Sequence, residues 1–427
     1  MCKKIGFVIY YNKDNIYSLN AIIAAIETGE FSENINFYYI LKKSDFIQNL
    51  YHIIKNHDLI LVGISFFTTQ LFDTYDLIRS LKSKFGDKCL FIAGGPHPTG
   101  DPAGTLEMGF DLVIVGEGEK TIKELVRSLY LNKSYDNIKG LAYFNEANNY
   151  IYTGRRVPIN LDKYPPFPIK NTRFGAIEIT RGCPYLCYFC QTPYISGTTP
   201  RHRNIEFICK YVKILHDYYG DLTDIRFITP NAFSYGSKDG KKVNLTKLES
   251  LLLNIREIIG EKAKIFIGTF PSEVRPEHVT QDALDLILKY ADNDNITIGA
   301  QSGSQKILEL CHRDHTSEDV FRAVNLALKL KLKINVDFIF GLPGEREEDV
   351  DLTIKMMRNL SKLGARIHAH SFIPLPQTPF AKQPVKPLNK AYKKAIKHLI
   401  SKGSLFGDWN KQEKLAIKIA HYLKNNT

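Results

Sequence analysis

Three cysteines stand close together in the run Arg181-Gly-Cys-Pro-Tyr-Leu-Cys-Tyr-Phe-Cys, at Cys183, Cys187 and Cys190. Their CxxxCxxC spacing offers three thiolates, whereas an ordinary [4Fe–4S] cluster takes four. One iron would then stay open to a substrate or a cofactor. A zinc site would need a second CxxC or a histidine pair nearby, and neither follows within the next forty residues. The spacing therefore favours an iron–sulfur loop over a zinc site or a group of structural cysteines.

This loop resembles the cysteine motif of the radical S-adenosylmethionine (SAM) superfamily. The resemblance implies a [4Fe–4S] cluster whose open iron is chelated by the amino and carboxylate groups of SAM. Phe189, the aromatic residue before the last cysteine, also fits the family pattern and is expected to contact SAM. The remaining cysteines, Cys2, Cys89, Cys209 and Cys311, are scattered, and no local spacing pairs them.

Length and composition set wider limits. A chain of 427 residues with 44% hydrophobic content predicts two or three globular domains. It has no run of 18 apolar residues, and its N-terminus enters a strand pattern without a cleavable apolar core. We therefore expect no membrane contact and a cytoplasmic location, since unpaired cysteines suit a reducing compartment.

The chain is basic, with a formal net charge of +12. The densest run of lysines lies between Lys382 and Lys424 at helical spacing, which indicates a solvated helix face or a docking surface for a substrate. No basic run is interleaved with aromatic residues, and this disfavours nucleic acid as a partner.

Residues 1–130 alternate short apolar runs with amphipathic segments. The runs at 5–11, 36–41, 59–65, 89–93 and 112–115 predict a parallel, doubly wound sheet of the Rossmann or flavodoxin type. Ligands of such sheets bind at the carboxyl ends of the strands. Here those ends carry Ser65, the run Gly94-Gly-Pro-His-Pro-Thr and the run Gly116-Glu-Gly-Glu.

Ser65 begins a triplet of serine, any residue and a hydrophobic residue, and the pair Gly94-Gly95 follows later in the chain. These two elements resemble the SxL and GG elements of cobalamin-binding domains. The residues that this resemblance assigns to cobalamin are Ser65, Gly94, Gly95, His97, Gly116, Glu117, Gly118 and Glu119. The Asp-x-His-x-x-Gly element, whose histidine binds cobalt in many such domains, is absent after the first strand. We therefore expect cobalamin without a protein histidine on cobalt, with His97 near the nucleotide tail. The alternative is a flavodoxin-like domain that binds no cobalamin.

Residues 131–172 break the alternation. They contain a predicted hairpin at 141–144 and 150–153, then four prolines between Pro158 and Pro168, and are expected to form a connector. Residues 173–375 return to alternating strands and helices and predict a partial (β/α)6 barrel of the TIM type, with the cysteine loop after its first strand. Residues 376–427 are expected to form a basic helical extension.

Polar residues at later strand ends resemble SAM contacts of the superfamily. The residues assigned by this resemblance are Glu273, Gln301, Arg313 and Asp337, with Gly341 to Gly344 near the adenine. Arginine suits the carboxylate of the methionine moiety, because its bonds there are charge-assisted. Two departures stand out: Asn231, where relatives often carry acidic or glycine-rich sequence, and Gln377, which replaces the glycine of a Pro-Leu-Pro-Gly-Thr-Pro run. Gln377 faces the substrate or forms a turn.

The combined resemblance implies a cobalamin-dependent radical SAM enzyme that uses a [4Fe–4S] cluster, SAM and cobalamin. The cofactors carry the chemistry, so no catalytic side chain is assigned. The favoured reaction methylates an unactivated sp³ carbon of a peptide, protein or small molecule, for example a glutamine of methyl-coenzyme M reductase, with an electron donor of the ferredoxin or flavodoxin kind. The alternatives are a cyclisation or rearrangement without methyl transfer, a tRNA-modifying radical SAM enzyme, and a cobalamin sensor with an inactive barrel.

Overall fold

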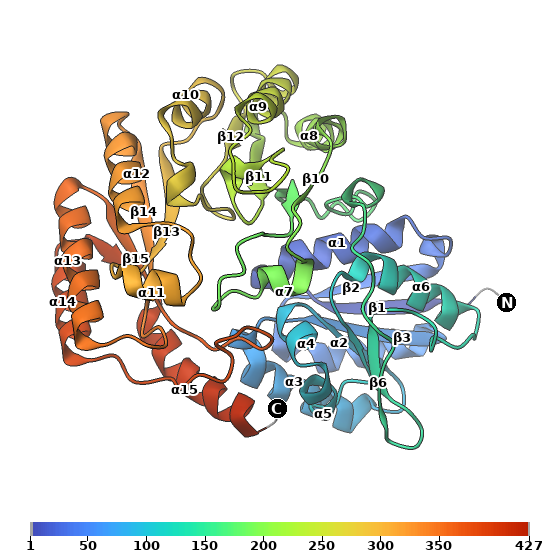
Figure 1. Cartoon of the computed structure of the whole chain (residues 1–427). Coiled ribbons are helices and arrows are strands. Elements are labelled where there is room, and N and C mark those ends of the chain that lie inside the picture. Colours follow the sequence, from blue (N-terminus) through green and yellow to red (C-terminus); the bar gives the residue numbers. More distant parts are fainter. Residues whose placement is uncertain (1–2, 426–427) are drawn as a thin grey trace. The chain divides into compact units, whose positions relative to one another are not determined.

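The computed structural model describes residues 3–425, so Cys2 lies outside the described residues. The chain divides into two compact units, the first ending at Gly175 and the second beginning at Ala176. Each unit is built on its own parallel strands (Figure 1).

The first unit contains a seven-stranded sheet in the order β2-β1-β3-β4-β5-β6-β7. Its first five strands run parallel, and the last two join antiparallel. The strands are β1 Ile5–Tyr10, β2 Ile35–Ile40, β3 Leu59–Ser65, β4 Leu90–Gly94, β5 Leu112–Ile114, β6 Leu141–Phe144 and β7 Tyr150–Tyr152. The strand order reverses between β1 and β3, and such switch points are where open α/β sheets bind ligands.

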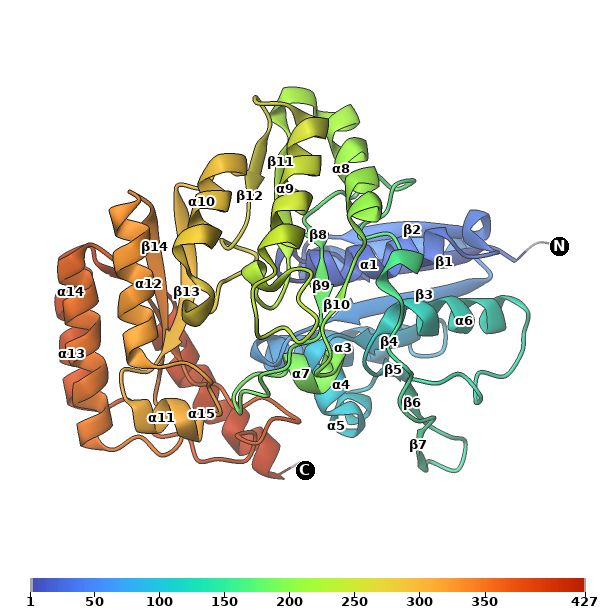
Figure 2. The ribbon, with the colours of Figure 1, turned by 45° about the horizontal axis from the view of Figure 1, so that its top comes forward.

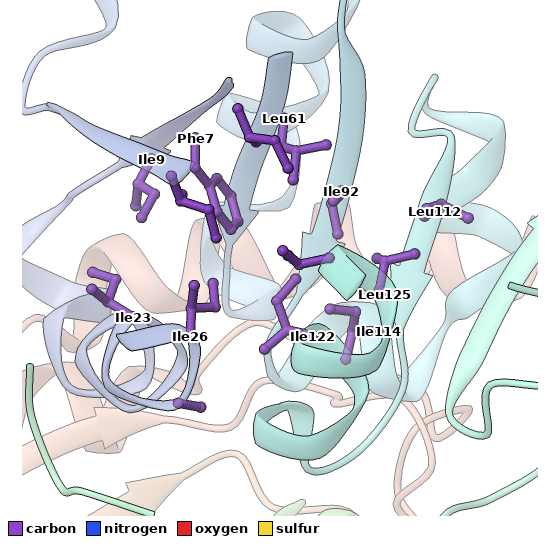
Figure 3. Packing of buried hydrophobic residues seen from close by; sticks show 14 of the residues in the cluster. Phe7, Ile9, Ile23, Ile26, Leu61, Ile92, Leu112, Ile114, Ile122 and Leu125 are labelled. Carbon is purple, nitrogen blue, oxygen red and sulfur yellow. The ribbon is translucent and has the colours of Figure 1, made fainter. Parts of the chain in front are cut away.

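The helices of this unit are α1 Ile16–Glu27, α2 Phe46–Ile53, α3 Leu71–Phe85, α4 Pro96–Gly100, α5 Pro102–Glu107 and α6 Gly118–Tyr130. One apolar cluster joins α1 and α6 to the sheet, and Figure 3 shows Ile23 and Ile122 of these helices facing the strand residues Phe7, Leu61 and Ile92. Each fully buried aliphatic side chain stabilises the fold by about 1.5–3 kcal/mol. This core holds the carboxyl ends of β3, β4 and β5 at one edge of the sheet.

The structure corrects the interpretation of residues 131–172 as a plain connector. The predicted hairpin exists, but β6 pairs with β5 and extends the sheet of the first unit. Leu141 and Ala142 are fully buried there, so the pairing is driven by a partner distant in sequence. The carboxylate of Glu27 then accepts hydrogen bonds from the backbone N–H groups of residues 169–171, which fastens the end of this segment to α1.

The second unit contains two parallel sheets. They have the orders β12-β11-β8 and β13-β14-β15-β16, and Val274, in the loop after β12, forms an isolated parallel bridge with Ile298 of β13. The strands are β8 Ile177–Glu178, β11 Asp224–Ile228, β12 Lys264–Phe266, β13 Asn295–Gln301, β14 Lys333–Phe340, β15 Arg366–Ser371 and β16 Leu405–Phe406. Short strands β9 Thr180–Arg181 and β10 Arg201–His202 form a separate antiparallel pair.

Helices alternate with these strands, as the barrel prediction required. They are α7 Thr192–Ser196, α8 Ile205–Tyr219, α9 Leu245–Ile259, α10 Gln281–Tyr290, α11 Gln305–Leu310, α12 Ser317–Lys329, α13 Glu347–Leu363, α14 Lys390–Ser401 and α15 Trp409–Asn425. Figure 2 shows α8 and α9 side by side, and these two helices are in contact.

Buried and partly buried side chains alternate along β14 and β15. In β14 the apolar residues Val336 and Phe338 are buried, while Asp337 between them is only partly buried. In β15 Ala369 is buried, while His368 and His370 share the opposite face. Successive side chains of a strand point to opposite faces, and Asp337 is the register partner of His368.

The C-terminal residues hold a strand that the sequence did not predict. Besides α14 and α15, they contribute β16, which pairs parallel to β15 through Leu405 and Phe406. The partial barrel therefore gains a seventh strand beyond the six predicted. Leu405 is 6% exposed, so the burial of this side chain against the neighbouring strand overrides the surrounding lysine-rich helical pattern.

Candidate active site and cofactor loops

The cysteine loop is fixed by backbone hydrogen bonds. Cys183 N–H donates to the Gly197 carbonyl at 3.1 Å, and Cys190 N–H donates to the Cys187 carbonyl at 3.0 Å. The N–H of Tyr188, between the second and third cysteines, donates to the Cys311 carbonyl at 3.0 Å. Burial raises the pKa of Cys190 to about 11 and also raises that of Cys183. Binding iron would therefore release protons from these thiols.

All three cysteines line one cavity of about 580 Å³ in the second unit. Five residues predicted to contact SAM line it too: Phe189, Glu273, Gln301, Arg313 and Asp337. Phe189 belongs to the cysteine loop, Gln301 ends β13 and Asp337 lies within β14, while Glu273 and Arg313 lie in the loops after β12 and α11. The cavity thus brings the predicted cluster ligands and the predicted SAM contacts into one place.

Arg313 gives this cavity a buried positive charge. Its Nη2 donates to the Gly299 carbonyl at 2.9 Å, and its Nη1 donates to Cys187 Sγ at 3.7 Å. Burial alone would lower the pKa of Arg313, but the negative charges of Cys187 and Glu273 outweigh it and raise that pKa. Its buried Nε has no hydrogen-bond partner among the described residues. A buried donor without a partner is costly, so Arg313 fits an anionic group such as a cluster thiolate or the SAM carboxylate.

Glu273 lies beside this charge and beside Asp337. Burial raises the pKa of Glu273 to about 7, and the negative charge of Asp337 adds to the rise, while Arg313 and Arg275 oppose it. Such a carboxyl group holds or releases a proton near neutral pH and can accept a hydrogen bond from a ribose hydroxyl or an amino group.

The cavity also contains Arg275 and His368, which the sequence did not single out. The Arg275 guanidinium lies 3.3 Å from the ring centroid of Tyr185. The signal for His368 was its period-two spacing with His370 on a barrel strand.

The two departures from the family pattern do not line this cavity. Asn231 is buried, and its Oδ1 accepts a hydrogen bond from the backbone N–H of Arg275 at 3.2 Å. Gln377 is exposed with φ of 67°, as expected for a turn residue.

Gly341 and Gly344, expected near the adenine, line a different cavity, shared with residues 383–389. In it Glu345 accepts hydrogen bonds from Tyr392 Oη at 2.9 Å and from Gly341 N–H at 3.0 Å. This second cavity does not include the cysteines.

The Glu345 carboxyl group is expected to make folding stability fall as pH rises. Burial raises its pKa from 4.5 to about 7, so the folded chain binds the proton more tightly than the unfolded chain. Stability is then lost progressively between about pH 4.5 and pH 7. Glu345→Gln should reduce this loss by about 1–3 kcal/mol in denaturant unfolding compared at about pH 5 and pH 7.5. Replacing the exposed Glu309 with glutamine is the control, and an equal effect of both substitutions would contradict the assignment.

In the first unit, Ser65 and the glycine pair meet at the carboxyl ends of β3 and β4. Ser65 Oγ lies 3.1 Å from Ser18 Oγ, and the Ser65 carbonyl accepts from Asn15 Nδ2 at 2.7 Å. Gly95 has φ of 97°, and a Cβ there would come within 2.7 Å of Ser65 Oγ. Close packing against Ser65 therefore requires glycine at position 95.

Gly94 and Gly116 differ from Gly95, because a Cβ on either would meet no atom within 4 Å. Gly116 N–H donates to Thr99 Oγ1 at 3.0 Å, which ties the loop after β5 to that after β4. Open space therefore borders the bare backbone at two strand ends. Such a space suits a ligand that lies against the backbone, as cobalamin would.

The other residues assigned to cobalamin have structural contacts of their own. His97 is fully buried, its Nδ1 lies 3.1 Å from Thr68 Oγ1, and burial lowers its pKa to about 4. Glu117 accepts a hydrogen bond from Ile159 N–H at 2.9 Å. A Cβ on Gly118 would lie 2.7 Å from Ile22, and Glu119 is 4% exposed.

Comparison with known proteins agrees with both halves of this description. The radical SAM superfamily model matches residues 177–357, and the B12 binding domain model matches residues 19–126. An uncharacterized methyltransferase of Pyrococcus horikoshii is 29% identical over 72% of this chain, and the match spans 66% of that relative, just under two thirds of its length.

Two solved structures share the fold. The radical SAM methyltransferase TsrM of Kitasatospora setae, solved with cobalamin and a [4Fe–4S] cluster, has a TM-score of 0.68 and 16% identity over 89% of this chain and 77% of that one. The cobalamin-dependent SAM radical enzyme OxsB has a TM-score of 0.64 and 16% identity over 94% of this chain and 55% of that one.

Among residues 3–425, no helix combines the length and apolar character needed to span a membrane. The radical SAM domain implies a [4Fe–4S] cluster and SAM, and the B12 binding domain implies cobalamin. The resemblances drawn from the cysteine loop and from the Ser65 and glycine elements are thereby confirmed at the level of family. The chain contains a radical SAM domain preceded by a B12 binding domain.

Proposed function

We propose that this protein is a cobalamin-dependent methyltransferase that acts on an unactivated sp³ carbon. The observation that carries this proposal is the single cavity that gathers Cys183, Cys187 and Cys190 with the buried Arg313 and Glu273. A B12 binding domain in the same chain supports methyl transfer as the outcome. The methyltransferase names of the Pyrococcus relative and of TsrM point the same way.

Each cavity residue has a task set by its chemistry. Three thiolates hold a cluster, and Arg313 binds the SAM carboxylate through the Nε that lacks a partner. Glu273 would accept hydrogen bonds from the ribose or the amino group, Gln301 would reach the methionine portion, and Phe189 would contact SAM. Cluster, SAM and cobalamin together supply hydrogen abstraction and a methyl group. The chain positions the cofactors and surrounds them with fixed charges.

The substrate that we propose is a protein side chain, for example a glutamine of methyl-coenzyme M reductase. The required electron donor is a ferredoxin-like or flavodoxin-like protein, and the reaction takes place in the cytoplasm. Such donors are commonly acidic, and α14 presents the exposed lysines Lys390, Lys394 and Lys397, which suit an acidic partner. Comparative mass spectrometry of the reductase from a strain lacking this gene tests the substrate, which should lose the mass of one methylene unit.

The reaction type is tested with the reconstituted protein, SAM, methylcobalamin, reductant and candidate substrate. Methylation of an sp³ carbon should yield 5′-deoxyadenosine and S-adenosylhomocysteine in parallel. A rearrangement or cyclisation would yield 5′-deoxyadenosine without S-adenosylhomocysteine. If neither product exceeds that of a Cys183→Ala variant, the enzyme proposal is wrong.

A further inference from the structure

Beside the predicted SAM contacts, the cavity holds an aspartate–histidine pair. Asp337 and His368 are register partners on β14 and β15, and Asp337 Oδ1 lies 3.0 Å from His368 Nδ1. The His368 ring is stacked on Phe406 of β16, at 4.5 Å between centroids and 8° between planes. His368 lines the cavity together with the three cysteines. Its ring is therefore held in place while one edge faces the reaction space.

A second histidine approaches the same nitrogen. His370 Nε2 lies 3.2 Å from His368 Nδ1, so Asp337 Oδ1 and the two ring nitrogens converge within 4.8 Å of one another. Two imidazoles and a carboxylate at this spacing suit either a divalent metal ion or a chain of shared protons. The hydrogen bonds behind His370 distinguish the two.

Gln412 sets the proton position on His370. Its Oε1 accepts from the backbone N–H of Ser371 at 2.9 Å, which turns its amide Nε2 toward His370 Nδ1 at 3.4 Å. His370 Nδ1 then accepts, and its Nε2 carries the hydrogen. A metal ion would need the lone pair of that Nε2. The network therefore favours protons over a metal ion.

His368 Nδ1 lies between a donor and an acceptor. It accepts from His370 Nε2–H when it is unprotonated, and it donates to Asp337 when it is protonated. In the first arrangement, the hydrogen of the neutral His368 ring is on Nε2. In the second, that hydrogen is on Nδ1, and Nε2 presents a lone pair. Nε2 makes no hydrogen bond to any residue in the described part of the chain. The Asp337 carboxylate at 3.0 Å outweighs the neutral His370 N–H at 3.2 Å, because a hydrogen bond to a charged acceptor is the stronger one, so the hydrogen on Nδ1 and the lone pair on Nε2 are favoured.

We propose that His368 is the acid–base residue of this cavity and takes a proton through Nε2 from an O–H or N–H group of the substrate. The substrate bond to hydrogen breaks heterolytically, its electron pair stays on the heteroatom, and an N–H bond forms at Nε2. The imidazolium is stabilised by Asp337, and no oxidant or reductant is consumed. This inference rests on the proposed function, because it requires the cavity to hold the substrate.

Other charged groups act on the pair from the surrounding elements. Glu273 adjoins Asp337, the Arg366 guanidinium lies 4.7 Å from the Phe406 ring centroid, and Asp408 acts on His370. Burial and then the neighbouring His368 lower the pKa of His370, which favours its neutral ring.

Carbethoxylation with diethyl pyrocarbonate tests the proposal on the full chain without turnover, because the reagent attacks an imidazole ring only at an accessible, unprotonated nitrogen. Trypsin releases residues 367–382 as one peptide that contains His368 and His370, and residues 398–402 as a peptide with the exposed reference His398. Fragment masses assign each modified ring. We expect His368 to react at least about tenfold faster than His370, whose ring is engaged at both nitrogens.

Asp337→Asn should slow the reaction of His368 by at least about threefold, because the carboxylate no longer holds the ring hydrogen on Nδ1 and Nε2 loses its lone pair. Thr297→Val, which alters the same cavity without touching the pair, should leave the rate unchanged. Faster reaction of His370, no response to Asp337→Asn, or protection of both rings by one equivalent of Zn²⁺ or Fe²⁺ would each overturn the proposal. Failure of the proposed function is observed separately, as absence of SAM cleavage by the wild-type protein.

Discussion

Replacing Cys190 with alanine is expected to abolish both cluster binding and SAM cleavage. The loop offers three thiolates, and the loss of one leaves two ligands for a cluster that already lacks a fourth protein ligand. Cys190 lines the cavity within a turn closed by the Cys187 carbonyl, so no neighbouring side chain of the loop replaces it. Iron content, visible absorbance and 5′-deoxyadenosine formation should all fall to background after anaerobic reconstitution.

Cys209→Ala is the matched control for this experiment. Cys209 lies on α8 outside the cavity and is only partly exposed, so its loss removes a thiol without changing the cluster loop. This variant should bind iron and cleave SAM like the wild-type chain. A cluster that survives in Cys190→Ala with full SAM cleavage would refute the three-cysteine site.

Gly94→Val is expected to remove cobalamin binding while the fold of the first unit survives. A Cβ at Gly94 meets no atom within 4 Å, so the valine enters open space at the end of β4. That is the space we expect cobalamin to fill, and crowding of this kind costs typically about 1–3 kcal/mol. The affinity for cobalamin should fall by about 10- to 100-fold or more in a titration followed by visible absorbance.

The neighbouring glycine is the control that separates binding from folding. A Cβ at Gly95 would lie 2.7 Å from Ser65 Oγ, at a φ of 97° that valine rarely adopts. Gly95→Val should therefore lower the thermal unfolding midpoint of the cobalamin-free protein, whereas Gly94→Val should not. Wild-type affinity in Gly94→Val would show that cobalamin does not lie against this strand end.

Short-range patterns in the sequence predicted most of the fold. The predicted run at 59–65 coincides with β3, because an apolar run marks a buried strand well. The hairpin at 141–152 was predicted as well, but its membership of the sheet depends on pairing with β5, and no local pattern encodes a distant partner. Strand β16 has only two residues within helical, lysine-rich sequence, too few for a period to register.

The candidate site likewise contains residues that the sequence predicted and residues that only the folded chain reveals. Cys183 and Arg313 could be chosen because motif spacing reflects the chemistry of their ligands directly. His97 was assigned from its place in a glycine run, but a run of residues does not reveal that the imidazole is turned into the protein interior. Strand register places His368 beside Asp337, and a cation–aromatic contact with Tyr185 holds Arg275. Both contacts are properties of the folded chain alone.

The unpartnered Nε of Arg313 also bears on how much folded protein survives. Burying that donor costs free energy in the cofactor-free chain, and the cost disappears when an anionic ligand pairs with it. Ligands that bind only the folded state raise the free energy of unfolding by mass action. Scarcity of iron or SAM is therefore expected to shorten the lifetime of the polypeptide itself, so that supply of cofactors sets abundance as well as activity.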